Sequence, residues 1–394
     1  MVVTVTDGII PHSGQNTRES QRGFDRLPGT AGTMVSGRVK HPALSTSADG
    51  ATIARSPVDM KSIHILFTFQ MIFCLAFSSA AKNRLIALMP AGTPFRQVLE
   101  GIWEELDTSN YTIDTITMSK SLKTEKLARQ CRKTDVNALI LMDGKAISAA
   151  GDLQKFDPFF VSLPKFVYMT LQVESTTGKL SNVAGIKFEV PVYTLVTNFR
   201  IISRKDISRV GVFHRKSFTS SIERAKELLK KEQISLQTVC VDCEKKEATT
   251  VKDALKTMKQ NFGKMIRRQR SEVFLVLADN LVVNNTSLSE FWIRKVKNRK
   301  IPVIASLDIL ASPKIGLAVF TADPDLLQLG IQAANQIMEY FENGTTIEEI
   351  GFEPVISIKS TLNEAVAREL DWKLKTEKLG RIDKIIKNSG SGLQ

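Results

Sequence analysis

From residue 83 onward, short apolar runs rich in β-branched residues alternate with longer stretches in which apolar positions recur every three or four residues. The first pattern is typical of buried strands and the second of amphipathic helices. Strands are predicted at residues 84–89, 111–117, 136–142, 165–169, 183–188, 209–214, 234–241, 272–278 and 301–305. Helices are predicted at residues 95–106, 122–132, 217–232, 249–262 and 287–296.

This alternation predicts an α/β fold. Strands separated by helices of such length form parallel sheets that are covered on both faces and joined by right-handed crossovers. The pattern runs through once up to residue 188 and restarts at residue 209, which predicts two Rossmann-like lobes. A chain of 394 residues has room for two or three such units, and its 22 Gly and 4 Cys exclude a collagen-like or disulfide-scaffold protein.

The first 59 residues have a different composition. They are rich in Gly, Ser, Thr and Pro and show no sustained apolar period. Such a segment buries too little apolar surface to offset the entropy of ordering it, so we expect residues 1–59 to be disordered or a spurious extension ahead of Met60.

Residues 60–81 resemble a secretory signal peptide. Lys61 supplies a short positive start, residues 63–77 an apolar core, and Ser79 and Ala81 the small residues that a signal peptidase requires. A buried helix or a membrane anchor is the alternative, but the apolar run of about 15 residues is short for a bilayer that needs about 20. We therefore expect cleavage near residue 81 and a periplasmic protein.

The chain is basic, with 54 Lys and Arg against 41 Asp and Glu and a net charge of +13. That balance permits nucleic acid or an anionic membrane as a partner. A helix-turn-helix of a repressor would have to precede residue 82, and residues 1–59 contain no pair of apolar-periodic helices. We therefore expect no nucleic-acid partner.

Ligands of open α/β sheets bind beyond the carboxyl ends of the strands, where loops lead into helices. The candidate ligand contacts are Thr93, Asp143 and Lys145 in the first lobe and Ser217, Asp279, Asn280 and Ser306 in the second. Thr170, after the fourth strand, is a further candidate. The alternative at each position is ordinary loop chemistry, since Gly and Pro form turns while Asp, Ser and Asn cap helices.

Asp279 is the strongest of these candidates. It follows the apolar run 272–278, so its carboxylate should emerge at the carboxyl end of a buried strand, where it suits an ammonium group. The alternative is that Asp279 only caps the helix near Ser287, or that Asn280 makes the contact instead.

No catalytic residue, metal or cofactor is expected. The chain has no nucleophile elbow, Walker loop or metal-ligand spacing, and three of its four histidines precede residue 82. The Cys240-Val-Asp-Cys243 stretch allows a structural disulfide or two free thiols. A redox-active pair is disfavoured because the stretch overlaps the end of a strand rather than the start of a helix.

Several stretches of the second half resemble a known family. They are Ser-Glu-Val-Phe-Leu-Val-Leu-Ala-Asp-Asn at 271–280, Ile-Pro-Val-Ile-Ala-Ser at 301–306, Gly-Leu-Ala-Val-Phe-Thr-Ala-Asp at 316–323, the 330–337 helix and the 344–371 region. With residues 83–372 as a whole, they resemble the bacterial ABC-transporter substrate-binding proteins of the type 1 periplasmic-binding fold, in the subgroup that includes aromatic-amino-acid binders. The chain departs from that family at Asp143–Lys145, where a hydroxyl-containing loop is usual, and at Pro324, where Tyr is common.

The resemblance implies two lobes joined by three crossings, with hinges near residues 190, 322 and 348. Residues 373–394 form a basic tail beyond the family's usual end, and their apolar residues predict one helical face that either packs on the body or docks to a partner or membrane surface. The resemblance assigns residues 82–190 plus 324–345 to lobe one and residues 191–323 plus 350–372 to lobe two. It further implies a monomer that closes around a small-molecule ligand, an amino acid among the candidates, and presents it to an ABC permease. A periplasmic sensor that feeds a membrane receptor is the alternative.

Overall fold

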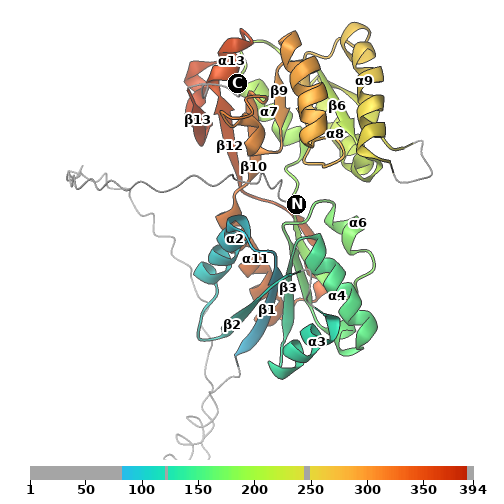
Figure 1. Cartoon of the computed structure of the whole chain (residues 1–394). Helices are drawn as coiled ribbons and strands as arrows, with labels where there is room; N and C mark the ends of the chain where they lie inside the picture. Colours follow the sequence, from blue (N-terminus) through green and yellow to red (C-terminus); the bar gives the residue numbers. More distant parts are fainter. Residues whose placement is uncertain (1–81, 120–122, 244–248, 388–394) are drawn as a thin grey trace, which may run out of the picture. The chain divides into compact units, whose positions relative to one another are not determined.

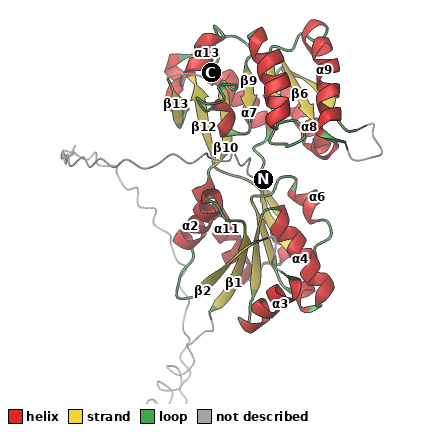
Figure 2. Cartoon of the chain, viewed as in Figure 1, coloured by secondary structure: helices red, strands yellow, loops and turns green. Residues whose placement is uncertain are grey.

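The computed structural model describes residues 82–119, 123–243 and 249–387 (Figure 1). The expected extension at 1–59, the expected signal peptide at 60–81 and the last residues of the tail lie outside these ranges. Within them, the chain forms two mostly parallel sheets, and Figure 2 shows helices against each sheet. No helix of the described ranges has both the length and the apolar character that crossing a bilayer requires.

The first sheet has six parallel strands in the order β11-β5-β4-β3-β1-β2. Its strands are β1 (Asn83–Met89), β2 (Tyr111–Thr117), β3 (Ala138–Met142), β4 (Lys165–Tyr168), β5 (Val183–Lys187) and β11 (Phe352–Pro354). One face packs on α2 (Thr93–Glu105) and α11 (Leu326–Phe341). The other packs on α3 (Thr124–Lys133), α4 (Gly144–Phe156), α5 (Phe159–Ser162) and α6 (Val173–Thr177). The short helix α12 (Ile347–Ile350) lies beside β5 on the face of α2 and α11.

The second sheet has seven strands in the order β13-β12-β10-β9-β8-β6-β7. They are β6 (Arg209–His214), β7 (Ser235–Cys240), β8 (Val273–Val276), β9 (Val303–Ala305), β10 (Phe320–Pro324), β12 (Ile358–Asn363) and β13 (Lys384–Ile386). One face packs on α7 (Val192–Ile202), α8 (Thr219–Lys231) and α13 (Glu364–Glu369). The other packs on α9 (Val251–Arg267), α10 (Asn285–Ser287) and the helical segment η2 (Leu288–Val296).

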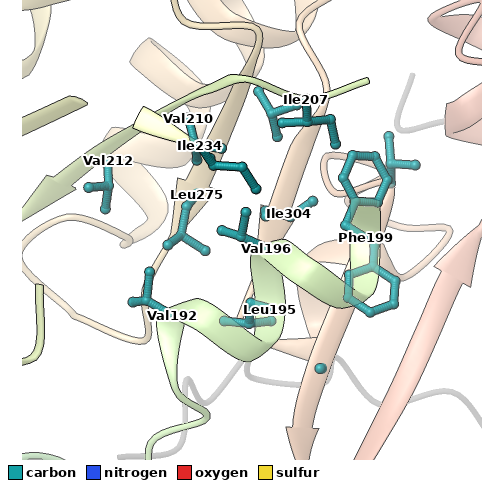
Figure 3. Packing of buried hydrophobic residues seen from close by; sticks show 14 of the residues in the cluster. Val192, Leu195, Val196, Phe199, Ile207, Val210, Val212, Ile234, Leu275 and Ile304 are labelled. Carbon is teal, nitrogen blue, oxygen red and sulfur yellow. The ribbon is translucent and has the colours of Figure 1, made fainter. Parts of the chain in front are cut away.

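Helix α7 illustrates how apolar spacing directs the packing. Its residues Val192, Leu195, Val196 and Phe199 recur at the spacing of one helical face and are all buried. They pack against side chains of the strands, Leu275 among them (Figure 3). This stretch, which follows the first expected hinge near residue 190, forms a helix because its apolar stripe has a sheet to cover.

The pattern predicted every strand up to β9, with ends that differ by a few residues. The expected strand at 301–305 is shorter because Pro302 has no N–H for the ladder, and β9 begins at Val303. Helix α4 was not anticipated, although Asp143 caps its first turn. The second sheet is also not wholly parallel, since β12 runs antiparallel to β10.

Two expectations for the end of the chain need correction. Residues 352–354 form β11 and pair with β5 of the first sheet, although residues 350–372 were assigned to lobe two. The third crossing therefore lies after β11, not near residue 348. The tail has no α-helical face among its described residues: η5 (Thr376–Arg381) is a 3₁₀ turn, and β13 pairs with β12.

Candidate functional site

The carboxyl ends of β6, β7, β8 and β9 gather polar side chains at one edge of the second sheet. We call this set, Arg215, Asp242, Asp279 and Ser306, the carboxyl edge. Its members follow neighbouring parallel strands, so the ladder itself brings them together. The rule that selected Asp279 and Ser306 from the sequence therefore operates in the fold.

Asp279 is almost wholly buried, with 3% of its side chain exposed. Its Oδ1 accepts a hydrogen bond from the backbone N–H of Leu281 at 2.7 Å, so this carboxylate does cap its own turn. Its Oδ2 accepts no hydrogen bond from the described residues and lies 3.8 Å from Nε of Arg215. Burial raises the pKa of Asp279, while the backbone N–H groups of Leu281 and Val282 and the Arg215 guanidinium oppose that rise.

Arg215 is held by a second carboxylate as well. Its Nε lies 3.4 Å from Oδ2 of Asp242, whose Oδ1 accepts a hydrogen bond from the backbone N–H of Lys216 at 2.6 Å. Both carboxylates contact the same nitrogen, and 41% of the Arg215 side chain is exposed. The rest of the guanidinium therefore remains available for an anionic group.

A disulfide joins Cys240 to Cys243 and encloses Asp242 between its ends. The sequence allowed either a structural disulfide or two free thiols, and the structure contains the disulfide. The two sulfurs and the Asp242 carboxylate lie within 4.8 Å of one another, but sulfurs bonded to each other supply no thiolate ligands to a metal. The loop that the disulfide closes thus carries the carboxylate that contacts Arg215.

Ser306 connects two strand ends. Its Oγ accepts a hydrogen bond from the backbone N–H of Ala278 at 2.9 Å, while its own N–H donates to Val276 at 3.1 Å. Asn280 is exposed, and its backbone oxygen accepts from the Asn284 side chain at 2.9 Å. Ser217 is exposed in the short 3₁₀ turn η1 (Lys216–Phe218).

The candidates of the first lobe lie at the carboxyl edge of the first sheet. Asp143 accepts hydrogen bonds at Oδ1 from the backbone N–H groups of Lys145 at 2.8 Å and Ala146 at 3.1 Å. Its carboxylate is thus used as the cap of α4, the alternative that the sequence had left open. Thr93 begins α2 and is exposed, as is Lys145.

A pocket of about 610 Å³ lies where the chain passes between the sheets. Ser306 is the one sequence-predicted candidate on its wall. Most of the remaining lining is apolar or aromatic, contributed by the 187–193 and 323–324 segments, by the start of α8 and by β11. Its aromatic side chains are Phe188, Tyr193, Phe218 and Phe352, and its charged ones are Lys187, Glu189, Arg224 and Asp323.

Two carboxylates of this pocket were not singled out from the sequence. Glu189 accepts hydrogen bonds from the backbone N–H of Gln172 and from its Nε2 at 2.9 Å, and burial raises its pKa. Asp323 accepts from the backbone N–H of Asp308, and burial, with a smaller contribution from the Asp308 charge, raises its pKa to about 7. Asp323 lies next to the last residue of β10, so the strand-end rule would have found it had β10 been predicted.

The comparisons with known proteins agree with this architecture. The model of the family described as ABC transporter substrate binding protein matches residues 172–385. A search of curated proteins finds no match. A ligand-free, open substrate-binding protein with adhesive properties from Clostridium difficile superimposes with a TM-score of 0.56 at 16% identity, over 78% of this chain and 100% of that one. A conserved domain protein from Vibrio cholerae gives 0.51 at 16% identity, over 77% and 99%. At such identity the likeness shows the fold alone, the type 1 periplasmic-binding fold.

Proposed function

Because the chain belongs to the family of ABC transporter substrate-binding proteins, we propose that it binds one small solute and delivers it to a membrane permease. Proteins of this family bind transport substrates outside the cytoplasm. For this chain we propose the periplasm, reached through a signal peptide at residues 60–81, and action as a monomer. The family match over residues 172–385 is the observation that carries the proposal.

We propose that the solute occupies the pocket and contacts the carboxyl edge of the second sheet. Leu277 and Ala278 line the pocket and lead directly into Asp279, while Ser306 belongs to both features. Phe218, on the pocket wall, follows Ser217 in the chain. Thr93, Asp143, Lys145 and Asn280 stay in the proposal as outer contacts, with less support because Asp143 already caps α4.

An amino acid is the solute that this chemistry fits best. Its ammonium group suits the buried carboxylate of Asp279 and the half-buried carboxylates of Glu189 and Asp323 on the pocket wall, through charge-assisted hydrogen bonds. Its carboxylate suits the exposed part of the Arg215 guanidinium, and an apolar side chain suits the aromatic part of the pocket wall.

Binding would proceed by hinge closure about three connections. They are residues 188–191 after β5, residue 325 after β10 and residues 355–357 after β11. The last two are tied together, because the backbone N–H of Asp325 donates to Ser357 at 3.1 Å and its carboxylate pairs with Lys359 at 3.0 Å. Two connections that are bonded to each other move together, which favours a rigid rotation of one lobe against the other over independent motions of the two loops.

A thermal-shift screen of the full chain with amino acids, small organic acids and sugars tests the proposal. A ligand at 100 times its dissociation constant adds about 2.7 kcal/mol to the free energy of unfolding, a readily measured shift. We expect a shift with an apolar or aromatic amino acid and none with sugars. No shift across all three classes would contradict the proposed function.

Solution scattering with the ligand found in that screen tests closure. We expect the radius of gyration to fall when the site is saturated. An unchanged radius would refute hinge closure while leaving solute binding in place.

A further inference from the structure

The charge of the chain is concentrated at one edge of the second sheet. We call residues 203–209, 230–235, 264–272, 294–302 and 312–319 the amino edge, because these segments lead into the amino ends of β6, β7, β8, β9 and β10. All of them belong to the described part of the chain. They contain fifteen basic and three acidic residues. The basic residues are Arg204, Lys205, Arg209, Lys230, Lys231, Lys264, Arg267, Arg268, Arg270, Arg294, Lys295, Lys297, Arg299, Lys300 and Lys314.

The segments of the amino edge are also hydrogen-bonded to one another. Ser235 donates its N–H to Ser208 at 2.8 Å, and Phe274 donates to Pro302 at 3.0 Å, so neighbouring connections meet at the strand starts. The Arg209 Nε donates to the backbone oxygen of Arg270 at 2.9 Å. The amino edge is therefore one continuous surface.

Most of this charge faces solvent. Of the fifteen basic side chains, thirteen are exposed, and the other two, Arg209 and Lys297, pair with Glu272 and Glu369. The remaining acidic residues of the edge, Asp206 and Glu232, pair with Arg200. A surplus of twelve positive charges thus remains on the edge, against +13 for the whole chain, so the rest of the sequence is nearly neutral.

The opposite edge of the same sheet has no such surplus. Asp242, Asp279, Asp308 and Asp323 lie at or beyond the carboxyl ends of its strands. The neighbouring cations balance them in number: Arg215, Lys216, Lys359 and Lys384. The segregation therefore separates the proposed solute-binding edge from the cationic surface. General solubility would require no such separation.

A second pocket, of about 600 Å³, opens beside the start of β6. Its wall holds four cations, Arg200, Arg204, Lys205 and Lys375, and two carboxylates, Asp206 and Glu232. Both carboxylates pair with Arg200, so the other three cations give the wall its positive charge. Ile201, with 36% of its surface exposed, adds an apolar side chain. A cationic hollow bordered by an apolar residue suits the phosphate headgroup of a lipid and the first part of its acyl chain.

We propose that the amino edge binds the surface of a membrane that contains anionic phospholipids. Clustered Lys and Arg side chains attract an anionic bilayer, and the attraction grows with the number of cations. The attraction acts within about one Debye length and requires no specific contact. A permease resides in a membrane, so adsorption would concentrate the loaded protein near its partner. The proposed solute-binding residues would lie at the opposite edge of the same sheet.

Sedimentation of the full chain with vesicles tests this surface. We expect binding to phosphatidylcholine vesicles that contain about 30% phosphatidylglycerol, little binding to pure phosphatidylcholine, and loss of binding at high salt. The triple change Arg268→Gln, Lys295→Gln and Lys300→Gln removes three exposed cations and should weaken vesicle binding at least tenfold.

The matched control is Lys126→Gln, Arg129→Gln and Lys133→Gln, three exposed cations of α3 in the first lobe. It should bind within about twofold of the unaltered chain. Both variants keep the apolar run 63–77, so any contribution of that run cancels. Melting curves establish that each variant is folded.

Three outcomes would overturn the proposal: equal loss in both triple variants, binding that does not depend on phosphatidylglycerol, or tighter binding to a short DNA duplex than to the vesicles. The outcome of the vesicle experiment is independent of the proposed function, because the thermal-shift screen measures solute binding at the carboxyl edge.

Discussion

The Nε atom of Arg215 lies 3.8 Å from Oδ2 of Asp279, an oxygen that accepts no hydrogen bond from the described residues. A buried carboxylate oxygen without a hydrogen-bond donor costs free energy, so a donor group of a bound solute at this position would be stabilising. The same carboxylate also stabilises its own turn through Leu281. A test of its binding role must therefore preserve the cap.

Replacing Asp279 by Asn removes the charge but keeps an oxygen acceptor for the Leu281 N–H. We expect the affinity for the solute to fall about tenfold to a hundredfold, because a charge-assisted hydrogen bond contributes about 1.5–3 kcal/mol and about 1.4 kcal/mol corresponds to one decade. Calorimetry with the solute found by thermal shift measures the change. Asp206→Asn, on the amino edge, is the control and should bind normally; a folded Asp279→Asn protein with unaltered affinity would remove Asp279 from the site.

The disulfide between Cys240 and Cys243 should support both stability and binding. The loop that it closes is short, so replacing both cysteines by Ser should lower the free energy of unfolding by only about 2 kcal/mol. Loss of the loop constraint also frees Asp242, one of the two carboxylates that hold Arg215, and we expect solute affinity to fall several-fold. Denaturant unfolding and calorimetry measure the two effects.

A reductant distinguishes the effect of losing the disulfide on solute affinity from other effects of the Cys→Ser substitutions. It should weaken binding by the unaltered protein and leave the double Ser variant unchanged. Equal sensitivity of both proteins would contradict the assigned role of the disulfide.

Asp323 should make stability depend on pH. Its pKa is raised from 3.8 to about 7 by burial, so the folded state holds a proton that the unfolded state releases between these values. The contribution of Asp323 to stability is therefore fully present below about pH 4 and is lost as the pH rises through 7. Asp323→Asn keeps an acceptor for Asp308, so we expect it to raise the free energy of unfolding above pH 7 by up to about 4 kcal/mol.

Denaturant unfolding at several pH values measures this dependence. Asp114→Asn, which removes an exposed carboxylate of β2, is the matched control variant for the same measurement. A profile for Asp323→Asn that parallels that of the unaltered protein would show that Asp323 does not titrate in this range.

Gly101 and Gly330 set the approach of α2 to α11, the helix that follows the second crossing. A Cβ on Gly330 would lie 2.2 Å from the backbone oxygen of Val98, and one on Gly101 would lie 2.1 Å from that of Leu327. Backbone atoms cannot move aside as flexible side chains do, so we expect Gly330→Ala to lower the free energy of unfolding by about 1–3 kcal/mol. Gly144→Ala, with no heavy atom within 4 Å, is the control and should be neutral in the same unfolding experiment.

The sequence by itself determined the elements and the edges where chemistry gathers. Buried parallel strands need continuous apolar runs, so the run at β6 predicts the observed ends of that strand, Arg209–His214. Polar residues after such runs emerge at the carboxyl edge, so the apolar pattern alone is enough to indicate Asp279 and Ser306. The basic surplus is also evident from the sequence, but its location is not.

Only the tertiary structure decided which distant segments meet. β11 lies beside β5 although more than 160 residues separate them, because the sheet edge offers a ladder partner that no local pattern encodes. Glu189 and Asp323 acquire raised pKa values from burial, which depends on what packs around a residue and not on its neighbours in sequence. The basic residues form one surface for the same reason: five separate connections end at the same edge of one sheet.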